Sequence, residues 1–433
     1  MSLPARTAAI IAVGSELLTA SRTDTNSLQI TGALNAAGIE VAFKAIVGDD
    51  RDELGAMCRQ AMARVPLVIF TGGLGPTDDD LTREVVAEVL GLALHEDAAV
   101  MAAIRARFEA RGLRMPEANR RQAAVPAGAH VLANPNGTAP GLWISAGDHG
   151  LLLMPGPPRE MRPMLAHAME AWVTPRWGGQ RLRRRELRIA GRTESRVEEI
   201  AQPLYSTWVS SPLPIETTIL AGPGVIELHL SVRSPDEAAA DQVLADAVAA
   251  LSARFPDDLV SDDGRSLEQV VGDDLRARGY RIAFAESCTG GLATSRLTDV
   301  PGSSAYLDRS VVAYSNESKI DLLGVGEDLL RAHGAVSEPV AAAMAEGVRA
   351  RAGVEIAVGI TGIAGPGGGT PEKPVGTVAI AVAGPAGTVV RTCRFVGGRG
   401  LIKTFAAGTA IDMVRRYLRG AAPDLDWAAR PSK

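Results

Sequence analysis

The sequence predicts an α/β protein with more than one domain, and three observations lead to this prediction. Short apolar runs alternate with segments of helical periodicity, which is typical of helices layered on a mostly parallel sheet. The chain has 433 residues, which is too long for one ordinary hydrophobic core. Two of the apolar runs also end in glycine-containing polar segments, and such strand ends are common ligand sites.

The N-terminal part gives the alternating pattern most clearly. The elements expected there are strands at Ala8–Val13, Glu40–Val47 and Leu67–Thr71 and helices at Asn26–Ala37 and Arg51–Arg64. Asp49 and Asp50 precede the second helix and supply capping carboxylates. The third strand is buried along its length and leads directly into a glycine-rich turn.

That turn carries the first candidate site. Glycines at the end of a parallel strand let backbone amides approach a phosphate, but Asp78, Asp79 and Asp80 follow at once. Carboxylates beside a phosphate favour a bridging divalent cation such as magnesium. The alternative is an acidic first turn of a helix, which the same residues also suit. Spacing alone leaves both interpretations open.

A second candidate site follows the expected strand Arg281–Ala285, in the run Glu286-Ser287-Cys288-Thr289-Gly290-Gly291. The glycine pair can open a helix whose N-terminal N–H groups would face an oxyanion or a phosphate. A hydroxyl nucleophile needs a group that removes its proton, and a lysine held neutral by burial can do this. We therefore predict Ser287 as nucleophile and Lys319 as base, with Tyr314 as a further activator.

Two alternatives compete with this prediction. Cys288 could be the nucleophile, since thiolates are intrinsically more reactive, although a cysteine at a strand end is commonly a small buried hydrophobe. The Ser-Cys-Thr run could also be a polar strand end without chemistry. His333 precedes a helix expected to begin near Glu338 and is interpreted as a loop or capping residue.

Between the two sites the pattern changes to that of a small α+β module. Its expected elements are strands at Glu186–Ile189, Ile215–Leu220 and Val225–Val232 and helices at Glu194–Leu204 and Asp236–Arg254. Its entrance is rich in arginine, at Arg176, Arg181, Arg183, Arg184, Arg185, Arg188 and Arg192. A nucleic-acid surface would use such a cluster, but aromatic residues are sparse and no Gly-x-x-Gly loop is present. We therefore expect a solvated or interdomain face.

The flanking segments are predicted from their turn-forming composition. Residues Pro256–Gly264 are interpreted as a linker before a helix at Ser266–Arg278. The segment after Gly420 lacks periodicity and is expected to fray.

Composition limits the classes of protein. Apolar residues make up 46% and charged residues 22%, the balance of a soluble globular protein. A net charge of −5 disfavours a dedicated nucleic-acid binder. Cys58, Cys288 and Cys393 are odd in number and far apart, so neither a disulfide framework nor zinc spacing results. With no apolar stretch of membrane-spanning length, we expect a cytoplasmic protein.

Motifs in both halves follow one known family in order. The N-terminal motifs are Gly14–Leu18, Asp24–Asn26, Thr71–Thr82, Asn119 with Gln122, Asn134–Gly141 and Pro155–Glu160. The C-terminal motifs are Ala285–Gly291, Tyr314–Lys319 and Thr361–Pro366, within a likeness that runs from Ser266 to Leu418. In these motifs the chain resembles the CinA family. It departs at Ser15 and Gly398, where the family often has aspartate.

The resemblance implies an architecture in four parts. An N-terminal three-layer α/β domain, similar to molybdopterin-binding domains, would cover residues 1–170. A KH-type α+β connecting domain would cover 171–260, and an α/β amidase domain 261–420. Residues 421–433 would form a tail.

For the C-terminal domain, the resemblance implies hydrolysis of nicotinamide mononucleotide to nicotinate mononucleotide and ammonia, without a cofactor. Ser287, Tyr314 and Lys319 would be catalytic. The glycine-rich loop Gly365–Lys373 would close over the nucleotide. The residues implied to bind substrate are Thr289, Gly290, Gly291, Ser303, Ser304, Asn316, Thr361, Gly362 and Arg399.

For the N-terminal domain, the resemblance implies a metal-dependent ADP-ribose pyrophosphatase in which a metal-activated water attacks the diphosphate, giving AMP and ribose 5-phosphate. Asp79 and Asp80 would bind the divalent ion, with Glu16 and Asp24 as further candidates. Magnesium is the expected ion, with cobalt and manganese as alternatives. The residues implied to contact the nucleotide are Thr71, Gly72, Gly73, Thr77, Asn134, Gly137 and Thr138.

Together these implications predict a bifunctional hydrolase of pyridine-nucleotide salvage that acts on small nucleotides. We expect a homodimer with no membrane attachment and no direct nucleic-acid contact. Two other classes stay open. The N-terminal domain could bind a pterin or nucleotide without turnover, or the chain could be an interaction protein in DNA uptake or repair.

Overall fold

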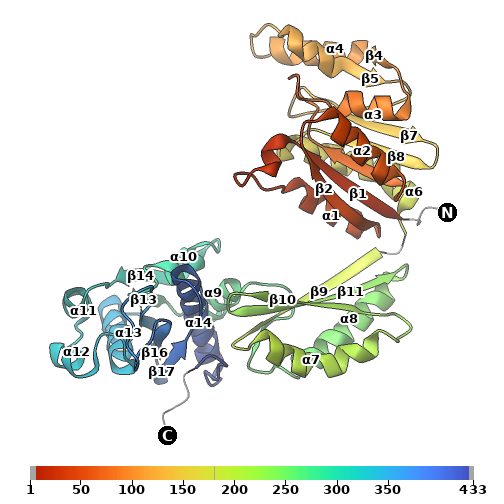
Figure 1. The fold of residues 1–433 in the computed structure, drawn as a ribbon. Coiled ribbons are helices and arrows are strands. Elements are labelled where there is room, and N and C mark those ends of the chain that lie inside the picture. The colour runs from red at the N-terminus through yellow and green to blue at the C-terminus, as the bar shows by residue number, and fades with distance from the viewer. Residues whose placement is uncertain (1–5, 180, 429–433) are drawn as a thin grey trace. The chain divides into compact units, whose positions relative to one another are not determined.

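The computed structural model describes residues 6–179 and 181–428. The chain divides into two units, Met1–Arg183 with Arg233–Ala239, and Arg184–Val232 with Ala240–Lys433 (Figure 1). The first unit therefore extends beyond the boundary predicted at residue 170. Of the predicted connector, residues 184–232 and 240–260 belong to the second unit and the rest to the first.

The N-terminal unit is a three-layer α/β structure. Its strands are β1 (Thr7–Val13), β2 (Glu40–Val47), β3 (Leu67–Thr71), β4 (Leu94–Glu96), β5 (Ala124–Pro126), β6 (His130–Leu132), β7 (Gly141–Ala146) and β8 (His149–Met154). Its helices are α1 (Asn26–Ala36), α2 (Arg51–Met62), α3 (Thr82–Leu90), α4 (Ala98–Glu109), α5 (Pro158–Ala168) and α6 (Thr174–Trp177). Short 3-10 segments lie at Ser15–Leu18 and Glu117–Ala123, and a π-helical segment lies at Met169–Val173.

The main sheet of this unit has the order β2-β1-β3-β8-β7-β6. Strands β1, β2, β3 and β8 are parallel, whereas β7 is antiparallel to β8 and β6, at the edge, is antiparallel to β7. Because side chains alternate along a strand, β1 contributes side chains to two hydrophobic clusters, one on each face of the sheet. Ile10 packs on the side of α1 and α5, and Ile11 on the side of α2 and α3. The carboxyl ends of the parallel strands consequently meet at one edge.

The predicted strand bounds Glu40–Val47 and Leu67–Thr71 are confirmed. Asp50 is the N-cap of α2, since its side chain accepts hydrogen bonds from Asp52 N and Glu53 N. Asp49 is not a second cap, because its carboxylate accepts from Ser15 N at 2.7 Å instead. Helix α2 ends at Met62, two residues before the predicted end.

The remaining elements form two further sheets with their helices. The strands are β9 (Arg181–Ala190), β10 (Glu216–Gly222), β11 (Val225–Ser234), β12 (Leu259–Ser261), β13 (Ile282–Glu286), β14 (Leu307–Val312), β15 (Ile356–Gly362), β16 (Thr377–Gly384) and β17 (Gly387–Arg394). The helices are α7 (Glu194–Trp208), α8 (Glu237–Ser252), α9 (Leu267–Arg278), α10 (Leu292–Thr298), α11 (Asn316–Leu323), α12 (Glu327–His333), α13 (Glu338–Ala352) and α14 (Arg399–Arg419), with a 3-10 turn at Ser303–Ala305.

The connector is an α+β layer, as predicted. Its sheet has the order β10-β11-β9-β12, and α7 and α8 pack with it around one apolar cluster. The segment predicted to be a linker at 256–264 contributes strand β12 to this sheet. The prediction is therefore wrong, because Asp258 and Ser261 are buried.

The segment after Gly420 is also ordered as far as it is described. Leu425 is buried in the C-terminal core, and Arg394 N donates to Trp427 O at 3.0 Å. Arg192 forms ion pairs with Asp424 and Asp426 at 2.9 and 3.2 Å. The prediction of a frayed tail is wrong for residues 421–428, and the rest of the tail lies outside the described residues.

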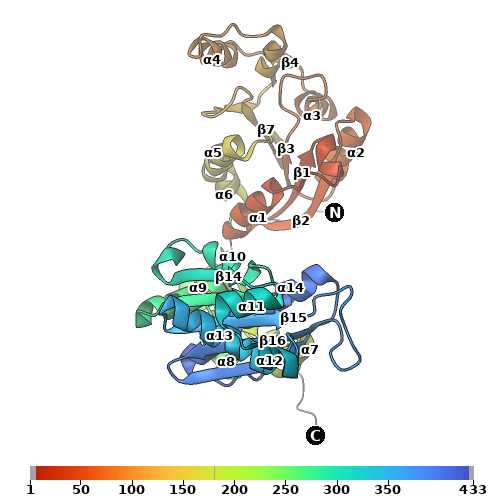
Figure 2. The same ribbon diagram turned by 90° about the vertical axis from the view of Figure 1, so that its left-hand side faces the viewer.

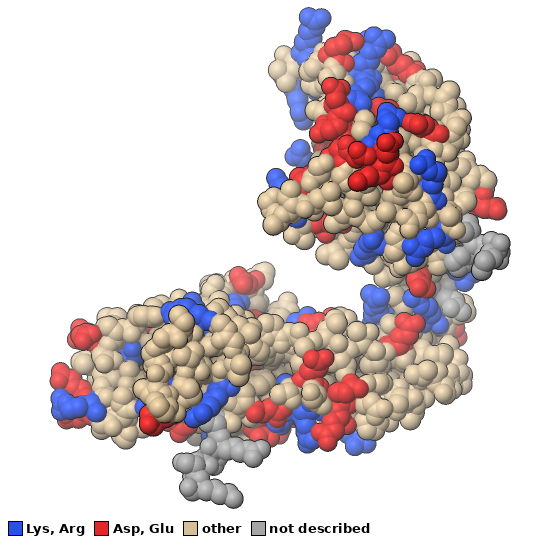
Figure 3. Space-filling view, in the orientation of Figure 1, with Lys and Arg blue, Asp and Glu red and all other residues tan. Residues whose placement is uncertain are grey.

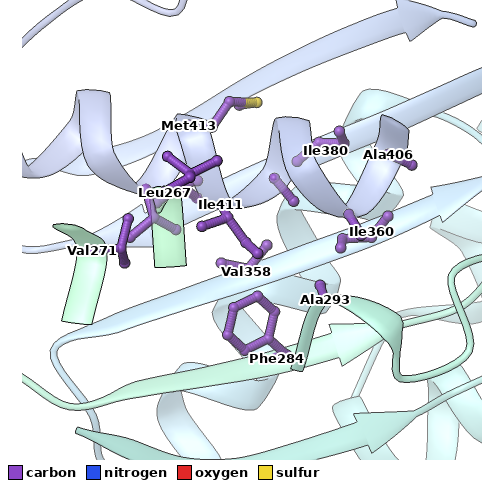
Figure 4. Close-up of a cluster of buried hydrophobic side chains, with 14 of the residues drawn as sticks. Leu267, Val271, Phe284, Ala293, Val358, Ile360, Ile380, Ala406, Ile411 and Met413 are labelled. Carbon is purple, nitrogen blue, oxygen red and sulfur yellow. The ribbon is translucent and has the colours of Figure 1, made fainter. Parts of the chain in front are cut away.

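The C-terminal sheet has the order β14-β13-β15-β16-β17, in which β13, β14 and β15 are parallel, β16 is antiparallel to β15, and β17 is antiparallel to β16. Helix α13 packs on one face, and α9, α10 and α14 on the other (Figure 2). Figure 4 shows Phe284, Val358 and Ile360 from neighbouring strands meeting Leu267 of α9 and Ile411 of α14. This core fixes the ends of β13 and β15, where the predicted nucleophile lies.

The arginines at the connector entrance are largely paired with acidic groups. Arg185 pairs with Asp241 at 3.3 Å, and Arg188 with Glu186 and Glu227 at 2.7 and 3.2 Å. These pairs favour the solvated or interdomain interpretation over a nucleic-acid surface. Figure 3 shows acidic side chains gathered on the N-terminal unit.

None of the described helices combines the length and apolarity needed to cross a membrane.

Candidate active site

The structure brings Ser287 and Lys319 together. Ser287 follows β13, and its backbone N–H donates to Ile360 O at 2.9 Å, which ties it to β15. Lys319 lies on α11, and its Nζ donates to Ser287 Oγ at 3.2 Å. The two residues are 7% and 1% exposed. The predicted nucleophile and the predicted base therefore share a buried hydrogen bond.

Three backbone carbonyls complete the surroundings of the lysine. Nζ lies 3.0 Å from Ala313 O, 3.3 Å from Tyr314 O and 3.4 Å from Ser315 O. Desolvation by burial lowers the pKa of Lys319, while the Cys288 thiol and the Glu317 carboxylate act in the opposite direction. No carboxylate ion-pairs with its ammonium among the described residues. A lysine in this setting gives up its proton more readily than an exposed one.

Cys288 lies beside the nucleophile but has the character of a packed side chain. It is 5% exposed, and its Sγ lies against Gly362, where an added Cβ would be 3.0 Å away. Burial raises the pKa of its thiol to about 12. A thiol that stays protonated is a poor nucleophile, so the geometry favours Ser287.

The hydroxyl of Tyr314 bonds to Arg399. Arg399 donates one hydrogen bond to Tyr314 Oη at 2.9 Å and another to Gly365 O at 2.7 Å. Only the backbone carbonyl of Tyr314 contacts Lys319. The main chain of Tyr314 contacts Lys319, while its side chain joins Arg399 at the edge of the cavity, and its role as an activator stays a prediction.

A cavity of about 270 Å³ opens beside this pair. Its walls include Asn316, Gly362 and Arg399, together with the glycine-rich loop from Gly365. Thr361 also lines it, although its hydroxyl donates to Ala335 O at 2.8 Å. These four predicted substrate-binding residues therefore share one cavity with Ser287, Tyr314 and Lys319.

Five other predicted substrate residues do not line this cavity. Thr289, Gly290 and Gly291 form the turn behind the nucleophile, and Thr289 is fully buried. Ser303 and Ser304 precede β14, which runs parallel to β13, so they lie at the opposite end of the sheet from Ser287. That placement contradicts their assignment to the same substrate site.

The predicted anion site at the start of α10 is wrong. Glu286, the last residue of β13, is fully buried and turns its carboxylate onto this helix end. It accepts from Gly291 N at 2.9 Å, Ala293 N at 3.2 Å and Thr294 N at 2.9 Å. The protein's own carboxylate thus occupies the donors that an oxyanion or a phosphate would need.

The N-terminal unit holds a separate cavity of about 830 Å³ at the carboxyl ends of β1 and β3. Thr71, Gly72, Gly73, Gly137 and Thr138 line it as predicted. Gly72 has φ +107°, and an added Cβ would lie 2.0 Å from Val13 O, so only glycine fits. The backbone can therefore approach a ligand closely here.

Glu16, Asp24, Asp79 and Asp80 all line this cavity, which also receives Arg22, Arg107, Arg111 and Arg159. Asp80 Oδ2 accepts from Thr77 N at 3.0 Å and also from Thr77 Oγ1. Thr77 itself does not line the cavity, so it orients Asp80 and is not placed to contact a nucleotide. Hydrogen bonding by Thr77 is the first cause of a lowered pKa at Asp79.

The four predicted metal ligands do not converge into one close cluster. Among the described residues, only Glu186, Glu227 and His229 of the connector bring three possible ligand atoms within 4.8 Å of one another. Asp24 Oδ1 accepts from Ser27 N at 3.0 Å and so serves the start of α1. The donors present still fit magnesium, which is often held by one or two carboxylates together with substrate phosphates. Asp79 and Asp80 are the residues best placed for that role.

Residues 264–418 match the family model "CinA C-terminal domain", and residues 9–174 match "Probable molybdopterin binding domain". A CinA-like protein of Koribacter versatilis is 46% identical over 419 residues, covering 95% of this chain and 99% of that protein. The chain belongs to the CinA family.

Two other CinA relatives match the chain over different extents. A putative competence-damage inducible protein of Symbiobacterium thermophilum is 46% identical over 427 residues, covering 95% of this chain and 99% of that protein. A solved structure, competence/damage inducible protein CihA from Agrobacterium tumefaciens, is 42% identical with a TM-score of 0.35 and covers 35% of this chain and 93% of its own. The fold is accordingly mixed α/β, with a molybdopterin-binding-type domain before the CinA domain.

In this CinA chain the structure also identifies residues to which the sequence analysis gave no role. Asn26 is buried at the wall of the N-terminal cavity, where its Nδ2 donates to Thr71 Oγ1 at 2.9 Å. Its Oδ1 has no partner among the described residues. Glu160 also lines this cavity and accepts from Asn134 Nδ2 at 2.7 Å, which makes Asn134 a supporting residue. Asn26 and Glu160 both lie in motifs that carried the family resemblance, and membership of those motifs was the sequence feature that could have identified them as site residues.

Proposed function

We propose that this chain is a nicotinamide-mononucleotide amidase whose reaction takes place at Ser287 and Lys319. The proposal depends mainly on one observation, the hydrogen bond of 3.2 Å between a buried lysine and a buried serine hydroxyl. Burial lowers the pKa of the lysine, which increases the fraction of neutral amine. The identity of the substrate comes from the family resemblance and from the size and lining of the cavity.

The reaction would proceed in two displacements. Neutral Lys319 accepts the proton of Ser287 Oγ as Oγ bonds to the carboxamide carbon. The C–N bond then breaks, and Lys319 returns the proton to the leaving nitrogen, which departs as ammonia. Water attacks the resulting ester, its proton passes to Lys319 and then to Ser287 Oγ, and nicotinate mononucleotide is released.

The residues around the pair suit a nucleotide. Arg399 presents a permanent cation at the cavity edge, where a phosphate could pair with it. Asn316 offers an amide that can donate to and accept from the carboxamide or ribose. Arg399 and Asn316 could make these contacts without a metal or an organic cofactor.

We propose that the N-terminal unit cleaves ADP-ribose. Its cavity of about 830 Å³ is large enough for a dinucleotide-sized ligand, and it combines a glycine-rich strand end with arginines and aspartates. Asp79 and Asp80 would hold a divalent ion, which when bound neutralises diphosphate charge and acidifies a water. Arg107 and Arg159 would bind the phosphates, and the backbone at Gly72 and Gly73 would let them approach.

The test uses the full chain. Ammonia release from nicotinamide mononucleotide, lost in Lys319→Ala but kept in the exposed control Lys44→Ala, would support the amidase. A folded wild-type chain that releases no ammonia would overturn it. For the N-terminal unit, AMP release from ADP-ribose is measured with magnesium, cobalt, manganese or a chelator. Binding without turnover would indicate a binding module, and a salt-sensitive DNA gel shift would favour the interaction protein.

A further inference from the structure

In the turn that carries the predicted nucleophile, two buried residues have backbone N–H groups that donate to no other described residue. Ser287 O accepts from Gly290 N at 3.1 Å, which closes a turn whose two central residues are Cys288 and Thr289. These residues are 5% and 0% exposed. Among the described residues, neither backbone N–H donates to another residue, although the Cys288 N–H interacts with its own thiol, and Thr289 Oγ1 has no partner.

Unpaired buried N–H groups are rare and call for an explanation. At a nucleophile that follows a strand and precedes a helix, the N–H of the next residue commonly stabilises the oxyanion. Cys288 is that next residue and lines the cavity beside Ser287. The start of α10 cannot take this role, because the Glu286 carboxylate already occupies its donors.

We propose that Glu286 is a positioning residue, which holds the Ser287–Gly290 turn so that the N–H of Cys288 stabilises the oxyanion. The inference rests on the proposed amidase function and deepens it. Both carboxylate oxygens of Glu286 are used, since Oε2 accepts from Gly291 N and Ala293 N, while Oε1 accepts from Thr294 N and from Thr294 Oγ1 at 2.7 Å. These bonds tie the last residue of β13 to the first turn of α10 across the nucleophile.

The role is one of position, because Glu286 is not among the charges that shift the pKa of Lys319. Its removal would therefore leave the base intact and misplace the oxyanion donor. Loss of one such donor typically lowers kcat by about 10²-fold or more. Binding of the substrate in its ground state, which would depend on cavity residues such as Asn316 and Arg399, should change much less.

The first test compares Glu286→Gln with wild type in the full chain. An amide cannot accept from Gly291 N and Ala293 N while it also accepts from Thr294, so the turn loses part of its support. We expect kcat for ammonia release to fall by roughly 10²-fold with KM nearly unchanged. A folded Glu286→Gln protein with wild-type kcat would overturn the proposal.

A milder pair keeps the test valid if Glu286→Gln does not fold. Thr294→Val removes one hydrogen bond to Glu286 and should lower kcat, whereas Thr294→Ser keeps the hydroxyl and should restore it. Thr298→Val is the matched control on the same helix, because its hydroxyl bonds only to Ser295 O at 2.6 Å. Equal kcat in Thr294→Val and Thr298→Val would contradict the inference.

A second readout separates this inference from the amidase proposal. A fluorophosphonate probe reacts when Ser287 Oγ bonds to phosphorus, fluoride leaves, and Lys319 takes the proton, and Ser287→Ala provides the unlabelled control. Slower labelling in Glu286→Gln supports the positioning role even if the wild type fails to hydrolyse nicotinamide mononucleotide. Labelling of Glu286→Gln at the wild-type rate counts against it.

Discussion

The ammonium of Lys319 lies 3.2 Å from the hydroxyl of Ser287 and faces backbone carbonyls on its other side. Carbonyl dipoles hold an amine in place without the full charge of a carboxylate. The arrangement therefore fixes the lysine while burial still lowers its pKa. From this relationship the chemistry of the C-terminal cavity can be tested directly.

Lys319→Arg should abolish the amidase activity even though it keeps a cation. Guanidinium does not lose its proton in proteins, so it cannot accept one from Ser287. We expect kcat/KM to fall by roughly 10²–10⁴-fold, the usual contribution of a general base. Ammonia release measures this, with Lys44→Arg as the exposed control. Substantial activity in a folded Lys319→Arg protein would exclude the lysine as base.

The pH profile should show a rising limb that belongs to Lys319. Only its neutral form accepts the proton, and its folded pKa lies below that of an ordinary lysine. Activity should therefore rise as pH passes the folded pKa and level off before the unfolded value. Because the unfolded chain binds more protons between those two pKa values, stability should also rise with pH in that window. A kcat/KM profile that rises only at the pKa of an exposed lysine would contradict the burial argument.

Cys288→Ala should keep most of the deamidation, whereas Ser287→Ala should lose it. The Cys288 thiol has its pKa raised to about 12 by burial, so it is protonated at neutral pH. The alanine variant removes the thiol but keeps the backbone N–H at that position. Steady-state ammonia release measures both variants. Activity in Ser287→Ala that is lost on adding Cys288→Ala would reverse the assignment.

Asp80→Asn should weaken magnesium binding and ADP-ribose cleavage in the N-terminal unit. The neighbouring Asp78 offers a matched control, because it pairs with Arg121 at 3.2 Å and does not line the cavity. We expect Asp78→Asn to retain activity and Asp80→Asn to need far more magnesium for AMP release. Calorimetric titration with the metal alone gives an independent readout. Equal magnesium dependence in the two variants would remove Asp80 from the site.

Arg416→Met should destabilise the second unit. Its side chain is 1% exposed and pairs with Asp412 at 2.7 Å and Asp258 at 2.8 Å. Its removal would leave these two buried carboxylates with one arginine each, Arg415 at Asp412 and Arg192 at Asp258. Breaking such a pair typically costs about 3–5 kcal/mol. Arg419→Met is the control, since that residue is 38% exposed and its single pair with Asp274 is worth less than about 1 kcal/mol. Urea unfolding compares them, and similar midpoints would show that the Arg416 pairs contribute little.

Much of the secondary structure could be predicted because it follows from patterns of residues that are close together in the sequence. The bounds of β2 and β3 and the cap at Asp50 follow from apolar runs and a capping carboxylate. Strand β12 was missed because it has only three residues and their neighbours are turn formers. The tail was missed because its order comes from Arg192, which lies more than two hundred residues earlier in the chain.

The sequence by itself determined the order of strands and helices, the family, and the residue types at both cavities, because periodicity, turn chemistry and motifs act over short stretches. Only the tertiary structure decided which of those residues meet. It placed Lys319 against Ser287, turned Tyr314 toward Arg399, put Ser303 at the far end of the sheet and closed the start of α10 with Glu286. The physical reason is that burial, hydrogen bonding and pKa depend on contacts between segments far apart in the chain.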